Sequence, residues 1–478
     1  MENRNSTILE GLNSEQKAAV GCVDGPVLIV AGAGSGKTRV LTSRIAYILE
    51  QKDLDPSRIL ALTFTKKAAS EMKERIALMV GERKARRLYM GTFHSVFIRF
   101  LREFSASLGY PETFTIYDTS DSVSAIKACL KELQLDEKVY KPKDVLSRIS
   151  MAKNNLVTAE AYRRNPNALQ NDASAKKPRI CDIYQKYSEK CRQAGVMDFD
   201  DILLNMNILL RDDPAALESI AGRFRYVMVD EYQDINPSQY RLVKGLLGDR
   251  KQLFVVGDDD QAIYGFRGAD IGNIERFCED FKESTQIRLE WNYRSVPNVL
   301  YLANDIFKNK PIHLRKMLRA GNLNGSGGNP LYKENRKPEI WVSDNPVEEV
   351  QKIILSIKEL RVGYDLAWKN FAVLVRYNRQ RLYYEQALRD YNIPVAGDVV
   401  ETASESGSEK ESASPEVTVE DGVHVETVHA SKGLQYAVVY YAGLCEKLTP
   451  GECTGERKAR KKQLDEERRL YYVGVTRA

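Results

Sequence analysis

The stretch Val27–Leu49 limits what this chain can fold into more than any other. Four apolar residues lead into the octapeptide Ala31–Thr38 (AGAGSGKT), and apolar residues recur after it at the spacing of a helix. This order predicts a buried strand, a glycine-rich loop and a helix. It is the P-loop pattern, although Ala31 stands where the strict pattern has glycine.

Each part of the octapeptide suits a phosphate group. Small residues at Gly34, Ser35 and Gly36 let backbone N–H groups close around phosphate oxygens at a helix N-terminus. Lys37 would reach the β- and γ-phosphates, and Thr38 would ligate Mg²⁺. A tight turn with a chance lysine is the alternative. It does not explain why the strand, the helix and the Lys-Thr pair occur together.

The composition indicates a soluble globular protein of several domains. A chain of 478 residues is too long for one hydrophobic core and suggests roughly three or four domains. The net charge of +5 permits a nucleic-acid partner but does not require one. The seven cysteines form no CxxC pair, which argues against zinc and suits a reducing compartment. With a polar N-terminus and no long apolar run, we expect a cytoplasmic protein without a membrane partner.

Polar and aromatic side chains follow two further predicted strands. The apolar run that begins at Ile59 ends in Thr63 and Phe64, and a shorter strand ends near Thr92 and His94. Strands that alternate with helices predict a parallel sheet with ligands at its carboxyl edge. Hydroxyls and a ring there suit a stacked base and its phosphates. A strand end followed by a solvated helix is the alternative.

An acidic pair follows the apolar run Tyr226–Val229. In a P-loop hydrolase Asp230 would hold Mg²⁺ and Glu231 would polarise the attacking water. A surface acid pair is the alternative, but the P-loop in the same chain favours the catalytic interpretation. The next predicted strand, Leu253–Gly257, leads into a loop in which Gln261 could contact the γ-phosphate.

That loop continues with two rings and a cation, and the chain then changes character. Tyr264, Phe266 and Arg267 suit base stacking. A charged helical insertion is predicted between about 97 and 197. A second sheet is predicted from Ile287 onward, and its expected strands are at 338–342, 371–376, 423–434 and 437–441, with a glycine-rich loop at 321–328.

Residues 396–422 break the pattern. They carry eight acidic residues and one basic residue, a net charge of −7, and serines fill much of the rest. This composition predicts a disordered, self-repelling linker.

Taken together, these stretches resemble the UvrD/PcrA/Rep family of superfamily 1A DNA helicases. The resemblance covers nearly the whole chain, and nine motifs in order are far more specific than any one of them. In chain order they are LNSEQKAAV (the Q motif), AGAGSGKT (I), TFTKKAASEM (Ia), GTFHS (Ib), VDEYQD (II), GDDDQAIYGFRGA (III), NYRS (IV), TVHASKGL (V) and EERRLYYVGVTRA (VI).

The resemblance implies an α/β fold with two RecA-like parallel-sheet domains, ATP in the cleft between them and single-stranded DNA across their top. The implied boundaries are 1–88 and 198–283 for the first RecA-like domain (1A), 89–197 for a helical domain (1B), 284–395 and 423–478 for the second RecA-like domain (2A), and 396–422 for the acidic linker in place of domain 2B.

The resemblance also implies residue roles for ATP and Mg²⁺. Gln16 would hydrogen-bond adenine and Tyr293 would stack on it, while Arg294 and Arg477 would act as arginine fingers. The expected catalytic set is Lys37, Glu231, Gln261, Arg294 and Arg477; the expected nucleotide contacts are Gln16, Gly34, Ser35, Gly36, Lys37, Thr38, Arg39, Tyr293 and Gln435; and the expected metal ligands are Thr38 and Asp230.

The resemblance likewise implies which residues contact DNA. Alternating grip by the two domains would move the protein 3′→5′ along the strand. The expected DNA contacts are Thr63, Phe64, Thr92, His94, Tyr264, Phe266, Arg267, Arg376, Asn378, His429 and Lys432.

Four features depart from the family pattern. Only the acidic linker stands where the helical 2B domain is expected, and Gln435 replaces the glutamate associated with the nucleotide ribose. Phe266 replaces tryptophan and Lys66 replaces asparagine. The sequence ends at Ala478, inside motif VI, before the expected last strand of 2A and the strand-separation pin.

We therefore expect an ATP-dependent 3′→5′ single-stranded DNA translocase and helicase of DNA repair or replication restart. The expected partner is single-stranded DNA or 3′-tailed duplex, with a repair protein as a conceivable loader, and the expected state is a monomer. Two alternatives stay open. One is a translocase that clears proteins from DNA without unwinding it, and the other is a DNA-binding fragment whose ATPase is uncoupled.

Overall fold

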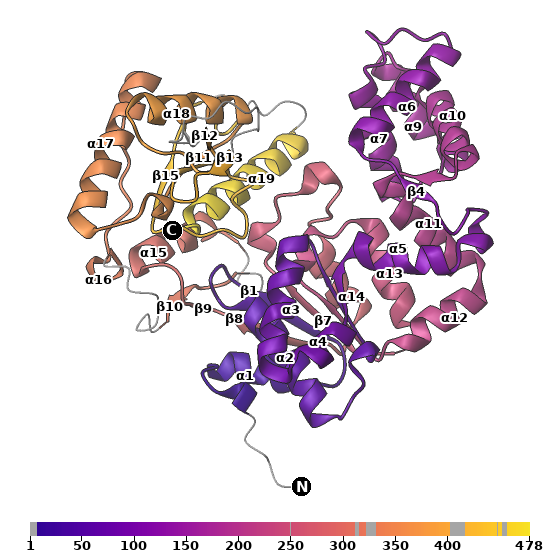
Figure 1. Cartoon of the computed structure of the whole chain (residues 1–478), viewed down its shortest axis with the longest axis horizontal. Helices are drawn as coiled ribbons and strands as arrows, with labels where there is room; N and C mark the ends of the chain where they lie inside the picture. The colour runs from indigo at the N-terminus through magenta and orange to yellow at the C-terminus, as the bar shows by residue number, and fades with distance from the viewer. Residues whose placement is uncertain are drawn as a thin grey trace, which may run out of the picture. The chain divides into compact units, whose positions relative to one another are not determined.

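The computed structural model describes residues 7–248, 250–310, 315–321, 331–401, 416–446, 448–451 and 457–478 (Figure 1). The chain folds into two compact units. The first unit comprises Met1–Ala31 and Lys37–Leu289, and the second comprises Gly32–Gly36 and Glu290–Ala478. Each unit is built on its own parallel sheet, so the predicted α/β class is confirmed.

A six-stranded parallel sheet forms the centre of the first unit. Its strand order is β3-β2-β6-β7-β1-β8, so the chain passes over β7 and β6 between β1 and β2. Because all neighbours are parallel, the carboxyl ends of the six strands lie at one edge. The bounds are β1 Val27–Ala31, β2 Ile59–Thr63, β3 Tyr89–Thr92, β6 Tyr226–Val229, β7 Leu253–Gly257 and β8 Thr285–Leu289.

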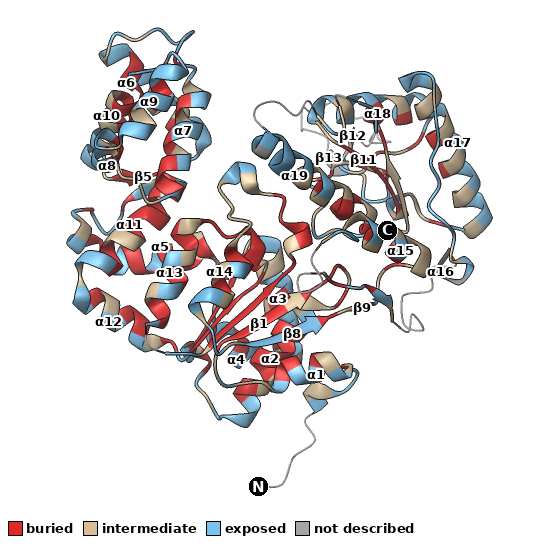
Figure 2. Cartoon of the chain, turned by 180° about the vertical axis from the view of Figure 1, so that it is seen from behind, coloured by how far each residue is buried: buried red, intermediate tan, exposed pale blue. Residues whose placement is uncertain are grey.

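Apolar runs build this sheet because both of its faces are covered by helices. Along β1, Leu28 enters one core, whereas Val27 and Ile29 enter the other. Figure 2 shows the inner strands buried and β8 more exposed at the edge of the sheet. The core that contains Leu28 is covered by α5 Phe93–Glu103, α11 Phe199–Asp212, α12 Pro214–Arg223, α13 Pro237–Leu247 and α14 Asn273–Asp280; the opposite core is covered by α1 Ser14–Gly21, α2 Lys37–Gln51, α3 Lys66–Val80 and α4 Glu82–Arg87.

A buried arginine fastens helix α1 to helix α2. The Arg44 guanidinium donates hydrogen bonds to the carbonyl oxygens of Ala19 (3.1 Å) and Cys22, at the end of α1. Its other face lies over the Phe254 ring, 4.2 Å from the centroid. Burial lowers the pKa of Arg44 to about 10, so the group still carries its charge at neutral pH.

A helical segment with a core of its own interrupts the first unit. A short parallel pair, β4 Thr115–Ile116 and β5 Val196–Met197, closes it at its base. Its helices are α6 Thr119–Glu132, α7 Pro142–Asn154, α8 Ala159–Arg163, α9 Pro166–Ser174 and α10 Ile180–Gln193, and they pack around one apolar cluster.

Two expected domain boundaries are corrected by strand pairing. Residue 89 is too early for the start of the helical segment, because β3 pairs with β2 (Leu60 opposite Tyr89) and α5 packs in the core of the sheet. Residue 284 is too early for the second sheet domain, because β8 pairs with β1 through Leu289.

A buried charge cluster joins the helical segment to α11. The Lys153 Nζ atom lies 2.7 Å from Asp198 Oδ2 and 2.7 Å from Asp201 Oδ1, and the Tyr187 hydroxyl donates to Asp198 Oδ2 (2.8 Å). Burial acts to lower the pKa of Lys153, but the two carboxylates outweigh burial and raise it. Burial and the charge of Asp198 together raise the pKa of Asp201 to about 6. The lysine therefore neutralises a carboxylate pair that could not be buried alone.

The second unit contains a smaller parallel sheet of order β14-β11-β15, with Val373 between Val425 and Tyr440. Its strands are β11 Phe371–Val375, β14 His424–Thr427 and β15 Val438–Tyr441, and a separate parallel pair is formed by β9 Trp291–Asn292 and β10 Arg319–Ala320. Its helices are α15 Pro297–Ile306, α16 Leu331–Glu334, α17 Pro346–Tyr364, α18 Asn378–Asp390 and α19 Arg457–Val475.

Two other predictions for the second unit are wrong in part. The expected strand at 338–342 is absent; Ile340 is 91% exposed, and only the Trp341 ring packs, near Tyr440. An apolar run becomes a strand only where a sheet edge accepts its hydrogen bonds. Inside the expected disordered linker, β12 Val399–Glu401 pairs antiparallel with β13 Glu416–Thr418, since β-branched residues recur there. Residues 402–415 and most of the glycine-rich loop lie outside the described residues.

None of the helices in the described parts of the chain is long and apolar enough to span a bilayer.

Replacing Lys153 with methionine should leave two buried carboxylates without their cation. We expect the free energy of unfolding of the first unit to fall by about 3–5 kcal/mol, measured by chemical unfolding. Lys177→Met, which removes the partner of the exposed Asp144 carboxylate, is the control and should change stability little. Adding Asp201→Asn to Lys153→Met should restore part of the loss. Wild-type stability of Lys153→Met would contradict this account of the cluster.

Candidate functional site

The carboxyl edge of the first sheet brings together loops that are distant in sequence. Lys37 begins α2 after the loop at the end of β1, and Asp230 and Glu231 follow β6. Thr63 ends β2, and Thr92 ends β3. The parallel topology thus gathers these residues, which follow or end the strands, at one edge.

Lys37 carries a buried cation that lacks a full partner. Among the described residues none accepts a hydrogen bond from its Nζ atom, and the carboxylate oxygen that pairs with it, Asp258 Oδ2, is 3.9 Å away. A buried ammonium without hydrogen bonds is costly. A phosphate oxygen would satisfy it, so the site fits the phosphate ligand that the P-loop pattern predicts.

The loop Gly32–Gly36 belongs to the second unit, where it contacts the segment that holds β9. The Asn292 side chain donates to the Ala33 carbonyl (2.7 Å), and the Tyr293 backbone N–H donates to the Gly34 carbonyl (2.9 Å). Gly34 has φ +66°, and a Cβ atom there would lie 2.5 Å from Asn292 Nδ2. Only glycine fits both the backbone conformation and the space.

Asp230 and Glu231 occupy the end of β6 in different ways. Asp230 is buried, its N–H donates to the Leu62 carbonyl (2.9 Å), and its Oδ1 accepts from the Glu231 N–H (3.0 Å). Glu231 adopts a left-handed conformation, φ 50° and ψ 44°, which a residue other than glycine rarely adopts. This conformation ends the extended backbone of β6.

The Gln261 side chain is held by Asp258, a residue that the sequence did not predict as part of the site. Its Nε2 atom donates to Asp258 Oδ2 at 2.6 Å, and both side chains are buried. The Asp258 N–H in turn donates to the side-chain oxygen of Gln233, 2.9 Å away. The sequence analysis did not select Gln233 as a site residue either. Its position in VDEYQD, separated from Glu231 by Tyr232 alone, could have indicated a role beside the acidic pair.

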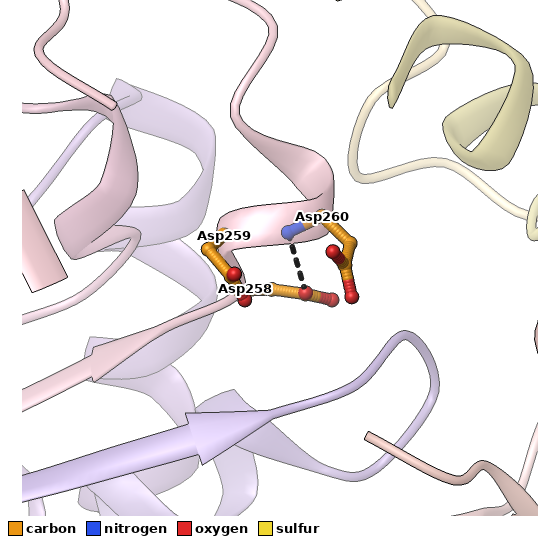
Figure 3. A group of neighbouring side chains, drawn as sticks. All are labelled: Asp258, Asp259 and Asp260. Atoms are coloured by element: carbon orange, nitrogen blue, oxygen red, sulfur yellow. Dashed lines mark hydrogen bonds between the residues drawn. The ribbon is translucent and has the colours of Figure 1, made fainter. Parts of the chain in front are cut away.

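Three consecutive acids, Asp258, Asp259 and Asp260, form a close carboxylate group (Figure 3). The carboxylate oxygens of Asp258 accept hydrogen bonds from the Asp260 N–H (3.2 Å) and from Gln261. Lys37 supplies positive charge nearby. The hydrogen bonds and the lysine compensate the charge of the Asp258 carboxylate in part. The metal ligands predicted from the sequence remain Thr38 and Asp230.

Four of the predicted DNA residues form an aromatic group. The Phe64 ring stacks on Tyr264 with centroids 5.1 Å apart, and Tyr264 lies 6.1 Å from the half-exposed Phe266. The Arg267 guanidinium lies over both Tyr264 (5.0 Å) and Phe266 (5.5 Å). Loops after β2 and β7 thereby present rings and a cation together, which is what base stacking requires.

Three other predicted DNA residues differ in character. The Thr63 hydroxyl is buried and has no hydrogen-bond partner among the described residues. Thr92 caps α5 through the Ser95 N–H (3.2 Å). His94 packs edge-on against the exposed ring of Phe199, and burial lowers its pKa to about 4 despite a hydrogen bond with the Phe199 backbone. His94 is therefore neutral at pH 7 and cannot attract phosphates by charge.

Gln16 and Arg39, two predicted nucleotide contacts, sit on α1 and α2. The side-chain oxygen of Gln16 accepts from the Asn13 N–H (3.1 Å), and Asn13 Oδ1 accepts from the Gln16 N–H (2.7 Å). This capping box holds Gln16 at the start of α1, where it is 2% exposed. Arg39 is exposed on α2.

In the second unit, both predicted arginine fingers bond to main-chain oxygens. Arg477 is buried and donates to Val473 O (2.9 Å) and Leu434 O (3.2 Å), and Arg294 donates to Thr476 O (3.1 Å). Tyr293 is 37% exposed and Gln435 is exposed. Stacking of Tyr293 on adenine and contact of Gln435 with the nucleotide stay predictions.

The predicted DNA residues of the second unit differ in burial and in bonding. Arg376 forms a paired salt bridge with Glu467 on α19, with Nη2 to Oε1 at 2.8 Å. Burial acts to lower the pKa of Arg376, but its bonds with Glu467 outweigh burial and raise it. Asn378 is exposed, and His429 and Lys432 are half-buried.

A P-loop after β1, an acidic pair after β6, two positions away in the same sheet, and the parallel direction of the strands define the class of P-loop nucleoside triphosphatases. Comparison with known proteins narrows the class. Residues 12–282 match the UvrD/REP helicase N-terminal domain, and residues 287–404 and 397–478 match the UvrD-like helicase C-terminal domain. The chain belongs to the UvrD/REP helicase family.

Similar curated proteins include two bacterial relatives named ATP-dependent DNA helicase PcrA. The relative from Staphylococcus epidermidis (strain ATCC 35984) is 40% identical over 389 residues, and that from Staphylococcus aureus (strain Mu50) is 40% identical over 390 residues. Each alignment covers 81% of this chain and 51% of the relative. The chain thus spans about half the length of the curated relatives it matches.

The half-buried position of His94 makes the titration of its ring a test of its surroundings. Because burial disfavours the charged imidazolium, its NMR titration midpoint should lie near pH 4 instead of near 6.5. The chain has four histidines, so the spectrum of His94→Gln identifies the resonance by its loss. A midpoint above pH 6 would show that the ring is hydrated and charged under mildly acidic conditions.

Proposed function

We propose that this chain is an ATP-driven DNA motor that moves 3′→5′ along single-stranded DNA and unwinds duplex ahead of it, in DNA repair or replication restart. The observation that carries the proposal is Lys37, a buried ammonium without a hydrogen-bond partner among the described residues, at the edge where Asp230, Glu231 and the aromatic group also lie. Membership in the family supports the choice of ATP and DNA as ligands.

In this proposal Lys37 holds the β- and γ-phosphates of ATP. Thr38 and Asp230 would hold Mg²⁺, which when bound neutralises charge on the phosphates. Glu231 orients and polarises the attacking water, and Gln261 contacts the γ-phosphate. Gln16 and Tyr293 hold adenine, and Arg294 and Arg477 stabilise charge during phosphoryl transfer. Arg39 and Gln435 complete the nucleotide contacts.

Phe64, Tyr264, Phe266 and Arg267 would hold single-stranded DNA by stacking and charge. Their loops follow β2 and β7, and the loop after β6, between these strands, carries Glu231. A change at the acidic pair can therefore reach the aromatic group through neighbouring strand ends. This proximity supports coupling of hydrolysis to movement. The further proposed contacts are Thr63, Thr92, His94, Arg376, Asn378, His429 and Lys432.

A second candidate is a translocase that clears proteins from DNA without unwinding it. The observation that favours it is the short connection 396–422, which leads from the end of α18 to β14 and contains the β12–β13 pair. The resemblance places a helical 2B domain there. Separation of a 3′-tailed duplex, absent with a 5′ tail, would support the helicase. Displacement of streptavidin from a biotinylated strand without duplex separation would support the second candidate.

Steady-state ATP hydrolysis with and without a single-stranded oligonucleotide tests the active site. Lys37→Met and Glu231→Gln should each lower DNA-stimulated hydrolysis by about 10²- to 10⁴-fold, because one holds the phosphates and the other activates water. Lys52→Met, an exposed lysine after α2, is the matched control and should retain wild-type rates. Unchanged hydrolysis in Lys37→Met would show that the proposed site is wrong. Wild-type hydrolysis without stimulation by DNA would favour an uncoupled fragment.

Single-strand affinity tests the aromatic group. Tyr264→Ala and Phe64→Ala should each weaken oligonucleotide binding by about 1–3 kcal/mol, the usual contribution of one stacked base. Fluorescence anisotropy at fixed ionic strength measures this affinity. Tyr301→Ala removes a 70% exposed ring from α15 and should bind as the wild type does. Equal affinities for all four proteins would place the DNA elsewhere.

A further inference from the structure

One buried amide connects the acidic pair to the neighbouring strand. Gln233, in the short helical turn Tyr232–Asp234, is 0% exposed. Its side-chain nitrogen donates to the Glu231 carboxylate oxygen Oε2. Its side-chain oxygen accepts from the backbone N–H of Asp258, 2.9 Å away, directly after β7. Both halves of the amide are therefore used, one toward each strand end.

The end of β7 is shaped to receive this amide. A Cβ atom at Gly257 would lie 3.0 Å from the side-chain oxygen of Gln233 and 3.5 Å from its backbone nitrogen. A side chain there would press on the amide, so the glycine leaves the space that Gln233 occupies. From Asp258 the hydrogen bonds continue to Gln261 Nε2 (2.6 Å). Glu231 and Gln261 are thus linked through Gln233 and Asp258.

The Glu231 backbone needs such support. Its φ of 50° is left-handed, and residues other than glycine hold this conformation only where their surroundings enforce it. The Glu231 N–H is bonded to Asp230 Oδ1 at 3.0 Å, and Gln233 bonds the other end of the residue, the carboxylate. Together these bonds restrict both the backbone and the side chain of Glu231.

We propose that Gln233 is a positioning residue that orients the Glu231 carboxylate toward the water that attacks the γ-phosphate and ties it to Gln261 through Asp258. This inference rests on the proposed function, because it assigns Gln233 a role only through Glu231. The hydrogen bond donated by Gln233 leaves the carboxylate one favoured direction, and the bond to Asp258 fixes that direction relative to β7.

Two substitutions separate the two bonds. Gln233→Leu keeps the approximate volume and removes both, whereas Gln233→Glu keeps an acceptor for the Asp258 N–H and removes the donor to Glu231. Both should lower kcat of DNA-stimulated ATP hydrolysis by about 10- to 100-fold, since a misplaced reacting group costs this much. KM for ATP should stay within about twofold, because Lys37 and the phosphate loop are intact.

A double-mutant cycle gives a readout that a merely structural role would not produce. If Gln233 acts through Glu231, then Gln233→Leu should add little to the loss caused by Glu231→Gln in single-turnover hydrolysis. Gln239→Leu is the matched control. It removes another buried glutamine amide of the same unit, which accepts from the Asn236 N–H (2.9 Å), and should leave kcat unchanged. Thermal unfolding and binding of a fluorescent ATP analogue confirm that each variant is folded.

The outcomes distinguish this inference from the proposed function. Hydrolysis that is unaffected by Lys37→Met overturns the proposed function and the role of Gln233 with it. Lys37-dependent hydrolysis with wild-type kcat in Gln233→Leu or Gln233→Glu overturns the role of Gln233 alone. A loss of kcat from Gln233→Leu that adds fully to the loss from Glu231→Gln also overturns the role of Gln233 alone. A fall in kcat with unchanged KM that is absent when Glu231 is already glutamine supports the role of Gln233.

Discussion

The parallel direction of six strands is the constraint on which the rest of the first unit depends. Because every strand of this sheet runs the same way, each strand ends at one edge, and the loops that follow β1, β2, β3, β6 and β7 meet there. Helices bury both faces of the sheet, so its strands are apolar along their length. Polar chemistry is confined to the strand ends. The catalytic and stacking residues proposed for this unit are near one another for that reason alone.

Buried charges separate structural groups from candidate functional ones. Arg44 donates to two carbonyl oxygens and lies over a ring, and Lys153 lies between two carboxylates. Lys153 is compensated by the two carboxylates, and Arg44 by its two carbonyl partners, although the Arg44 Nε atom has no hydrogen-bond partner among the described residues. Lys37 has only a carboxylate at 3.9 Å and no hydrogen bond among the described residues. A cation that the fold buries without satisfying is one that a ligand can satisfy, and Lys37 meets that description.

Sequence patterns located strands well where an apolar run is buried on both sides. The run ending at Val229 and the run Leu253–Gly257 are strands in the structure, because burial of both faces leaves an uninterrupted apolar signal. The apolar pattern gave wrong strand predictions where the outcome depends on which strands pair. Residues 338–342 have the apolar character of a strand but pair with no sheet. Strand β8 pairs with β1 in the first sheet, although the sequence predicts the second sheet domain from this point. Strand partners are remote in sequence, so local composition does not contain this information.

The sequence by itself determined the phosphate loop, the acidic pair and the family, since each depends on residue types at fixed short spacing. Only the tertiary structure decided which side chains act together. It stacks Phe64 on Tyr264, engages Arg376 with Glu467, keeps His94 neutral and sets Gln233 between Glu231 and Asp258. These relations depend on strand order and burial, which arise from contacts between distant segments and leave no spacing pattern in the chain.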